Sequence, residues 1–236
     1  MEHWVSTFLD SLERAKSPAQ AFSAVAEAAR QLGFEWCAYG HQHPLPFTRS
    51  DCFLISNYME LWRLRYAEAD YLAVDPTVSR ARMSMQPMVW DEQVHREAPQ
   101  MWEEARAFGL RHGWAQSCFA PNGAVGLLSL SRSVEPLNRA ELLEKEPQLC
   151  WLVGRTHAAM SAHLAKPATR DGKRLTRQEK AMLRWTADGK SASQTARIAS
   201  LSPHTVEWHL KNAARKLGAG TRAAATARAA ASGMLR

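Results

Sequence analysis

The hydrophobic positions in the first two thirds of the chain follow two different periods. A spacing of three to four residues, which places apolar side chains on one face of a helix, predicts helices at 4–12, 17–33, 57–68, 99–111 and 138–164. Shorter apolar runs predict strands at 34–40, 52–56, 114–120 and 124–131. The last two strands are separated by Pro-Asn-Gly, a hairpin signal. Helices before, between and after such strands predict an antiparallel sheet covered by helices on both sides.

From residue 175 onward the pattern is entirely helical. Helix starts are predicted where Thr176 precedes Glu179 and Ser191 precedes Gln194 in capping-box spacing, where Pro203 follows Ser202, and at Thr221. The stretch 165–174 is almost free of apolar residues and is typical of a linker. The sequence therefore predicts a first domain at 1–165, a linker at 166–174 and a second domain at 175–236. The predicted fold class is α+β, an N-terminal α/β/α sandwich with a central antiparallel sheet plus a C-terminal all-α four-helix domain.

Charge separates the same two regions. The chain has 236 residues, 46% of them hydrophobic, and a formal net charge of +7. Residues 1–166 carry 16 Lys and Arg against 19 Asp and Glu, whereas 167–236 carry 14 against 4. A basic domain behind a slightly acidic one favours a polyanionic partner such as nucleic acid, and a merely well-solvated tail is the alternative.

Composition and motifs also exclude several classes of protein. The four widely spaced cysteines are not typical of a disulfide framework and indicate a reducing compartment. No apolar stretch approaches the roughly 20 residues that span a bilayer, so we expect neither export nor membrane insertion, and a cytoplasmic location. The run Gly189-Lys190-Ser191 lacks the glycine that a phosphate-binding loop needs five places earlier, where Arg184 stands.

The predicted third helix of the basic domain has two distinct faces. One face carries an apolar stripe of Val206, Leu210, Ala213 or Ala214, and Leu217. The other carries His204, Glu207, Lys211 and Arg215. Two short helices followed by such a third are typical of a helix-turn-helix, whose last helix enters the major groove. In that arrangement Lys211 could donate to guanine, Glu207 could accept from a cytosine amine, and Arg215 could bind a phosphate. The alternative is an ordinary solvated helix face whose positive charges have no partner in DNA.

The second domain resembles the DNA-binding domain of the LuxR family. The resemblance lies in the elements LT-x-x-E, W-x-A-x-G-K-S, TV-x-x-H and N-x-x-x-KL between Leu175 and Leu217. The chain departs from the family at 194–196, where Gln-Thr-Ala replaces the usual Glu-Ile-Ala. The resemblance and the exposed face together imply DNA contacts by Lys190, Ser191, Ser202, His204, Thr205, Glu207, Trp208, Lys211 and Arg215.

The first domain resembles the acyl-homoserine-lactone-binding domain of quorum-sensing LuxR receptors. The segments "SNYMELWRLRYAEADYLAVDPTV", "QPMVW", "WEEARAFGLRHGW" and "GLLSLSRS" carry the resemblance, which spans most of residues 1–165. LuxR-type DNA-binding domains are also attached to phosphate-accepting receivers. The first predicted strand ends in "CAYGHQH" rather than in an acidic cluster, which argues against a receiver.

The resemblance implies roles for named residues. Trp62 would donate to the lactone carbonyl, Tyr58 to the amide carbonyl, and Asp75 would accept from the amide N–H. Ser129 would bond an acyl-chain oxygen or the amide carbonyl, and Trp90 would cover the lactone ring. The remaining wall is assigned to Tyr66, Thr77, Val78, Trp102 and Leu110.

Each assignment has a purely structural alternative. Tyr58, Trp62 and Tyr66 recur every four residues, as core aromatics on a helix do. Asp75 before Pro76 is also a common turn start, and Ser129 could be an ordinary strand hydroxyl. The joint order and spacing of these residues favour the ligand site over the separate structural roles.

The whole sequence thus predicts a dimeric transcription factor that binds an acyl-homoserine lactone and pseudo-palindromic promoter DNA to regulate quorum-sensing genes. RNA polymerase is a further candidate partner, and neither a cofactor nor a metal is expected. A regulator whose first domain is a ligand-independent protein-interaction module is the alternative. An enzyme is disfavoured because the sequence has no HxHxDH, HExxH or GxSxG motif. The pairs His41 and His43, and His157 and His163, are predicted to be surface histidines rather than metal ligands.

Overall fold

The computed structural model describes residues 3–48, 52–165, 169 and 174–235. The chain divides into two compact units, chiefly between Leu164 and Ala165. The predicted linker at 166–174 lies outside the described residues except for Thr169 and Arg174. Within the described ranges, no helix combines the length and the apolar character needed to cross a membrane.

The first unit is built on a five-stranded sheet. Its strands are β1 (Trp36–Gln42), β2 (Cys52–Ser56), β3 (Met88–Val89), β4 (His112–Phe119) and β5 (Val125–Arg132). Their order across the sheet is β2-β1-β5-β4-β3, and every neighbouring pair is antiparallel. The turn between β4 and β5 places Gly123 at φ +82°, a conformation that other residues rarely adopt. The antiparallel sheet and the predicted hairpin are therefore confirmed, although the first strand begins two residues later than expected.

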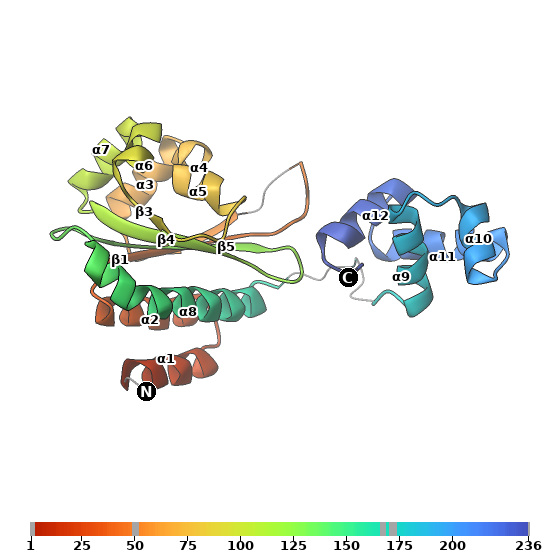
Figure 1. Cartoon of the computed structure of the whole chain (residues 1–236), viewed down its shortest axis with the longest axis horizontal. Coiled ribbons are helices and arrows are strands. Elements are labelled where there is room, and N and C mark those ends of the chain that lie inside the picture. Colours follow the sequence, from red (N-terminus) through yellow and green to blue (C-terminus); the bar gives the residue numbers. More distant parts are fainter. Residues whose placement is uncertain (1–2, 49–51, 166–168, 170–173, 236) are drawn as a thin grey trace. The chain divides into compact units, whose positions relative to one another are not determined.

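Helices cover both faces of this sheet (Figure 1). On one face lie α2 (Pro18–Gln31) and α8 (Arg139–His163), with α1 (His3–Arg14) packed on α2. On the other face lie α3 (Glu60–Glu68), α4 (Tyr71–Val74), α5 (Pro76–Ala81), α6 (Glu92–Glu97) and α7 (Pro99–Ala107). This arrangement confirms the predicted α/β/α sandwich. The short helices α4 to α6 and the edge strand β3 were not predicted.

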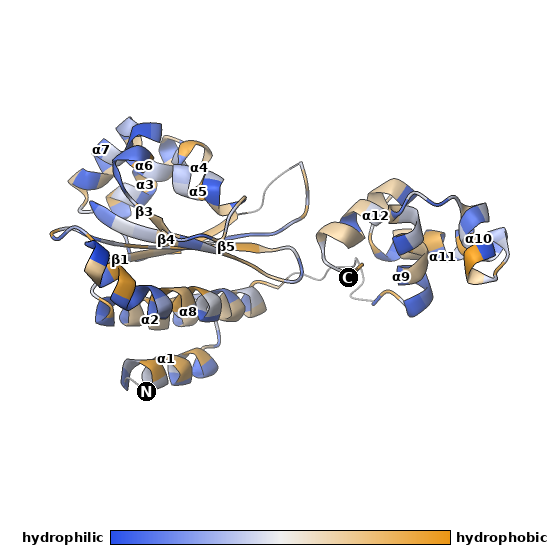
Figure 2. Ribbon diagram, in the orientation of Figure 1, coloured by the Kyte–Doolittle hydropathy of each residue, from blue (hydrophilic) through white to orange (hydrophobic). Residues whose placement is uncertain are grey.

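The face under α2 and α8 is filled by large side chains. Both helices alternate between hydrophobic and hydrophilic residues along their length (Figure 2), so that their apolar sides meet the sheet. Ser17 caps the start of α2 by accepting the backbone N–H of Gln20, as its position in the sequence predicts. The buried cluster includes Phe22, Phe34, Tyr39, Trp114, Leu128, Leu130, Leu149, Leu152 and Met160.

Two histidines expected at the surface belong to this packed layer instead. His41 is 1% exposed and His157 is 3% exposed. β1 continues through Gln42, so His41 points to the same side as Tyr39, and His157 lies on the sheet-facing side of α8. The Tyr39 hydroxyl lies 2.7 Å from Nδ1 of His157. Burial lowers the pKa of His157 and raises that of Tyr39, so the tyrosine donates to a neutral imidazole.

The second unit consists of α9 (Arg177–Ala187), α10 (Ala192–Ala199), α11 (Pro203–Lys216) and α12 (Arg222–Ala231). Both predicted capping boxes are present, and the side chains of Ser202 and Thr221 cap the other two helices. The helices enclose a core of Leu175, Met182, Leu183, Ala196, Val206, Leu210, Ala213, Leu217, Ala225 and Ala229. The predicted all-α domain of four helices is confirmed.

A buried ion pair joins the first and third of these helices. Nζ of Lys216 lies 2.8 Å from Oε2 of Glu179, whose side chain is almost fully enclosed. Burial alone would raise the pKa of Glu179, but the ion pair and the hydrogen bond from Thr176 bring it below its usual value. Glu179 therefore fixes α11 against α9 while closing the cap of its own helix.

Gly126 gives a test of the packed face. A Cβ at this position would lie 2.2 Å from Nδ1 of His157 and 2.8 Å from the Tyr39 hydroxyl. We expect Gly126→Ala to lower the free energy of unfolding by about 1–3 kcal/mol, because the buried pair must move. Urea denaturation measures the change. Gly154→Ala on α8, where a Cβ meets open space, is the matched control. Equal stability of the two variants would contradict this account.

Candidate functional site

A cavity of about 560 Å³ separates the sheet from α3, α5 and α7. Its walls are mainly apolar with a few polar groups, as is usual for a small-molecule site. The structure brings all ten residues of the predicted ligand site to this one cavity. They are Tyr58, Trp62, Tyr66, Thr77, Val78, Asp75, Trp90, Trp102, Leu110 and Ser129.

The aromatic row predicted on one helix is only partly helical. α3 begins at Glu60, so Tyr58 precedes it in an extended segment, while Trp62 and Tyr66 lie one turn apart within it. The rings of Trp62 and Tyr66 meet edge to face, with centroids 5.9 Å apart. Trp62 is only 3% exposed and contributes to the cavity wall.

Asp75 is held by three protein donors. Its Oδ1 accepts the Thr77 backbone N–H at 2.8 Å and the Thr77 hydroxyl at 2.7 Å, while Oδ2 accepts the Tyr66 hydroxyl at 2.9 Å. The bond to the Thr77 N–H also caps α5, with Pro76 in its first turn. A carboxylate has about four acceptor positions, so Oδ2 retains capacity for one further donor.

Burial controls the protonation of the polar groups in the cavity. It raises the pKa of Asp75 above its ordinary value, while the hydrogen bonds from Thr77 and Tyr66 and the nearby backbone N–H of Val78 act in the opposite direction. Burial is also the main reason that the pKa values of Tyr58 and Tyr66 are raised, and the Asp75 charge adds to it. Both phenols therefore remain protonated donors at neutral pH.

The indole rings of Trp90 and Trp102, which we call the aromatic box, form one end of the cavity. The rings of Trp90 and Trp102 are 4.8 Å apart. Trp102 donates its indole N–H to the Val94 carbonyl at 3.1 Å, whereas the buried Nε1 of Trp90 has no partner among the residues that the structure describes. Trp90 lies directly on Gly113 of β4, where a Cβ would come within 2.3 Å of the indole. Because Gly113 has no side chain, the Trp90 indole can lie directly against β4.

The sheet contributes the floor of the cavity. Ala38, Gly40 and Gln42 of β1 alternate with Cys37 and Tyr39, which face the packed layer, and with His41, which is buried beside Tyr39 and also contributes to the cavity wall. Ser129 is opposite Ala38, Leu127 is opposite Gly40, and Val125 is opposite Gln42. Along β5 the floor therefore changes from the small, polar Ser129 to the apolar Leu127 and Val125, while Gln42 of β1 is polar.

Several cavity residues were not predicted from the sequence. They are Ala38, Gly40, His41, Gln42, Cys52, Leu54, Ile55, Ser56, Arg63, Ala67, Asp70, Leu72, Ala81, Arg82, Met101, Ala105, Val125 and Leu127. Alternation along 36–42 shows which strand residues share a face, but not which face carries the cavity. Arg63 follows Trp62 directly and is otherwise exposed, so helical spacing gave no sign of its position.

The other predicted site lies on the second unit. Val206 and Leu210 of α11 and its C-cap residue Leu217 are buried, whereas His204, Glu207, Lys211 and Arg215 are exposed. This confirms the division of the helix into a packing face and an outer face. Trp208 is 57% exposed on the outer side, an unusual position for so large an apolar ring. Glu207 lies 3.5 Å from Arg222 of α12 in an exposed ion pair.

Two further predicted contacts are helix caps. Ser191 accepts the N–H of Gln194, and Ser202 accepts the N–H of Thr205 at 3.0 Å. The Ser202 and Thr205 hydroxyls also bond each other at 2.8 Å. Both caps are exposed, so the N-termini of α10 and α11, which favour anions, lie at the surface, and Lys190 directly precedes the cap of α10.

Among the residues that the structure describes, no group of three or more His, Cys, Asp or Glu side chains could hold a metal ion. The features that remain are a largely apolar cavity with a polar centre and a basic helical surface.

Comparison with known proteins accounts for both features. The family description "Autoinducer binding domain" matches residues 17–160, and "Bacterial regulatory proteins, luxR family" matches residues 173–229. The transcriptional activator protein AnoR of Acinetobacter nosocomialis is 36% identical over 238 residues, covering all of both chains. The relatives that match are transcriptional regulators.

Solved structures show the same architecture. SdiA of Escherichia coli in complex with octanoyl-rac-glycerol superposes with a TM-score of 0.79 at 30% identity, covering 99% of this chain and 95% of that one. The N-acylhomoserine-lactone-dependent factor CepR2 of Burkholderia cenocepacia has a TM-score of 0.64 at 31% identity, covering 70% and 96%. The chain therefore belongs to the LuxR family of quorum-sensing transcriptional regulators, with an autoinducer-binding domain followed by a helix-turn-helix domain.

Proposed function

We propose that the cavity of the first unit binds an N-acyl-homoserine lactone and that α11 of the second unit reads promoter DNA. The observation that carries the proposal is the Asp75 carboxylate, which is fixed by Tyr66 and Thr77 and has capacity for one more donor inside a largely apolar cavity. An acyl amide offers that donor beside an apolar chain. The dependence of CepR2 on acyl-homoserine lactones supports the same ligand class.

The other cavity residues suit the rest of such a ligand. Tyr58 and Trp62 are donors for the amide and lactone carbonyls, and the Ser129 hydroxyl lies on the floor where the acyl chain begins. Trp90 and Trp102 would enclose the lactone ring together with Leu110. Thr77, Tyr66 and Val78 complete the wall around Asp75.

On the second unit, the exposed side chains of α11 divide into two groups. Lys211, Glu207, His204 and Trp208 would face base edges, because they lie on the outer side of the helix. The remaining predicted contacts, Lys190, Ser191, Ser202, Thr205 and Arg215, would hold phosphates and set the position of the helix. The exposed ion pair of Glu207 with Arg222 would lie on the surface that meets DNA.

Ligand and DNA binding would be linked through dimerisation. A homodimer spaces two α11 helices for the halves of a pseudo-palindrome, and a ligand that stabilises the dimer-competent first unit thereby raises DNA occupancy. The protein would work without catalysis in the cytoplasm, where its DNA target lies. Contact with RNA polymerase stays a prediction from the family.

Asp75→Asn tests the ligand-binding half. The variant keeps the shape of the side chain but removes its charge, so we expect the affinity for a lactone to fall about 10- to 100-fold, as for loss of a hydrogen bond to a charged group. Isothermal titration of the full-length protein measures this. Asp10→Asn on the exposed surface of α1 removes the same charge outside the cavity and should bind normally. Unchanged affinity in Asp75→Asn would refute the assigned role.

Gly113→Ala tests the aromatic box without touching a hydrogen-bonding group. The added methyl displaces Trp90 from β4, so we expect lactone affinity to fall by about tenfold or more while DNA binding by ligand-saturated protein persists. Lactone titration and DNA binding are measured on the same preparation. If the affinity is retained, Trp90 does not form the ring-binding wall.

Lys211→Ala tests the DNA-binding half. We expect the affinity for target DNA to fall by about 1–3 kcal/mol with lactone uptake unchanged, because a base contact is lost. Fluorescence anisotropy with target and scrambled duplexes at fixed salt separates specific from nonspecific binding. As a control, Lys180→Ala removes one positive charge from α9 rather than from the outer face of α11. A similar loss of specificity in both variants would show that Lys211 contributes only charge.

A further inference from the structure

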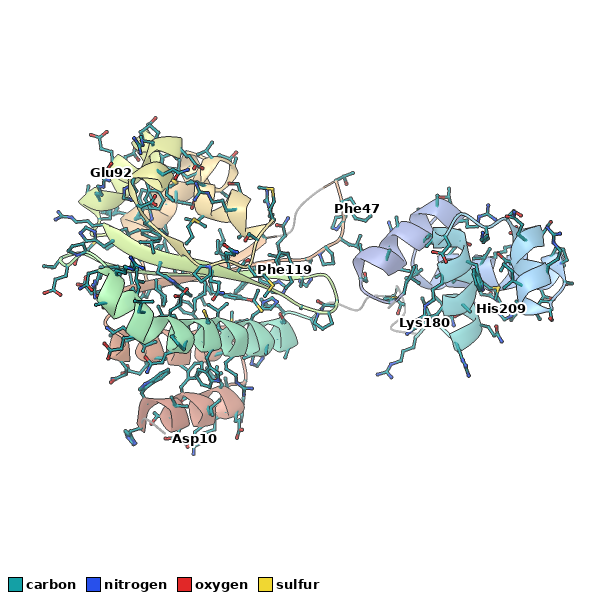
Figure 3. The ribbon with its side chains drawn as sticks, in the orientation of Figure 1. Asp10, Phe47, Glu92, Phe119, Lys180 and His209 are labelled. Carbon is teal, nitrogen blue, oxygen red and sulfur yellow. The ribbon has the colours of Figure 1, made fainter. Side chains whose placement is uncertain are left out.

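The register of the sheet divides the cavity floor into three rows. The first row contains Ser56, Ala38 and Ser129, the second contains Leu54, Gly40 and Leu127, and the third contains Cys52, Gln42 and Val125. All nine residues belong to the cavity wall. The third row continues to Phe119 at the end of β4. Figure 3 shows Phe119 and Glu92 of α6 toward opposite ends of the first unit, so the third row is remote from the aromatic box.

The middle row is wide because its central residue lacks a side chain. Gly40 lies between Leu54 and Leu127, and a Cβ there would come within 3.3 Å of Cδ2 of Leu54. Its backbone is ordinary extended strand, since its φ is not positive. The glycine is therefore not required by the backbone of β1, and its effect is to leave space above the sheet.

The third row is closed by a polar pair. Nε of Arg82 donates to Oε1 of Gln42 at 3.1 Å, across the end of the cavity that both residues line. Asp75 directly precedes α5 and Arg82 directly follows it. This short helix therefore places the ligand-facing carboxylate at its start and the Arg82–Gln42 pair at its end. An alkyl chain that passes the pair must separate the two polar groups or enter water.

The distance between the first and third rows determines how long an extended acyl chain can be before it reaches Gln42. Four strand residues separate the Ser129 row from the Gln42 row, which is about 13–14 Å at the rise of an antiparallel strand. An extended chain advances about 3.8 Å over three bonds, so this distance takes about ten or eleven bonds. The middle row lies about five bonds from the first.

We infer that Gly40 and the Arg82–Gln42 pair set the acyl-chain length of the ligand, and that the protein selects chains of about ten to twelve carbons. The inference rests on the proposed function, which places the acyl carbonyl beside Ser129. Each buried methylene raises affinity about fourfold. Affinity should therefore rise with length until the chain reaches the third row and then fall, because a longer chain must separate Arg82 from Gln42 or enter water.

A competition experiment measures this profile directly. Full-length protein is expressed in medium with an equimolar mixture of homoserine lactones that carry unsubstituted butanoyl, hexanoyl, octanoyl, decanoyl, dodecanoyl and hexadecanoyl chains. The lactones that copurify are quantified by mass spectrometry. Wild-type protein should hold mainly the decanoyl and dodecanoyl lactones. A maximum at butanoyl or hexanoyl, or at hexadecanoyl, would overturn the inference.

Gly40→Leu should move the maximum to about six carbons, because the new side chain fills the middle row. Gly154→Leu on the exposed side of α8 adds the same atoms where a Cβ meets open space, and should keep the wild-type profile. Arg82→Met removes the polar closure and retains a long side chain. It should raise the share of the hexadecanoyl lactone about tenfold, which tests the outer end even if Gly40→Leu does not fold.

The outcomes distinguish failure of the proposed function from failure of the chain-length inference. Wild-type protein that binds target DNA specifically but holds no lactone of any length would refute the proposed function. Wild-type protein that holds lactones, with variants that change all lengths in equal proportion, would refute the length assignment alone. Opposite shifts in Gly40→Leu and Arg82→Met would support it.

Discussion

The first unit depends on one constraint, which is that the two faces of a single sheet are filled differently. Alternate residues of β1 and β5 point to opposite sides. Toward α2 and α8 the layer is closed by large rings and chains, including Tyr39, Trp114 and Leu128. Toward α3 to α7, small residues such as Ala38, Gly40 and Ser129 leave a cavity. The packed face supplies the rigidity that lets the other face remain hollow, because interiors with native packing transmit strain rather than absorb it.

Asp75 connects the fold of the cavity wall to its chemistry. The same carboxylate caps α5, accepts the Tyr66 hydroxyl from α3 and faces the cavity. Its structural role is therefore compatible with the proposed role in ligand binding, although the sequence presented the two as alternatives. A turn-forming aspartate before proline is common, and what distinguishes this one is burial, which disfavours the charged form unless donors surround it. The protein provides three donors and leaves capacity for one more.

Sequence patterns predicted those parts of the molecule that local rules determine. Capping boxes at Thr176 and Ser191 and the apolar stripe of α11 follow from neighbours within one turn, and the structure confirms them. The burial of His41 and His157 could not be found that way, because it depends on how β1 and α8 meet. The predicted ligand residues converge on one cavity, but the family resemblance placed them, and periodicity alone would have assigned Trp62 and Tyr66 to a core. Gly40 and Gly113 matter through what lies opposite them, and a single sequence carries no sign of that.

The hollow face also determines how a ligand can act on DNA binding. A cavity of about 560 Å³ removes contacts from every side chain that lines it, and such a loss lowers stability in proportion to the empty volume. A molecule that fills the space restores those contacts only in the folded state, so its concentration shifts the folding equilibrium of the first unit. No rearrangement at a distance is needed for this effect. The proposed ligand would complete the core of the first unit. The second unit has a core of its own, so it would respond through the dimer that the ligand-bound first unit forms.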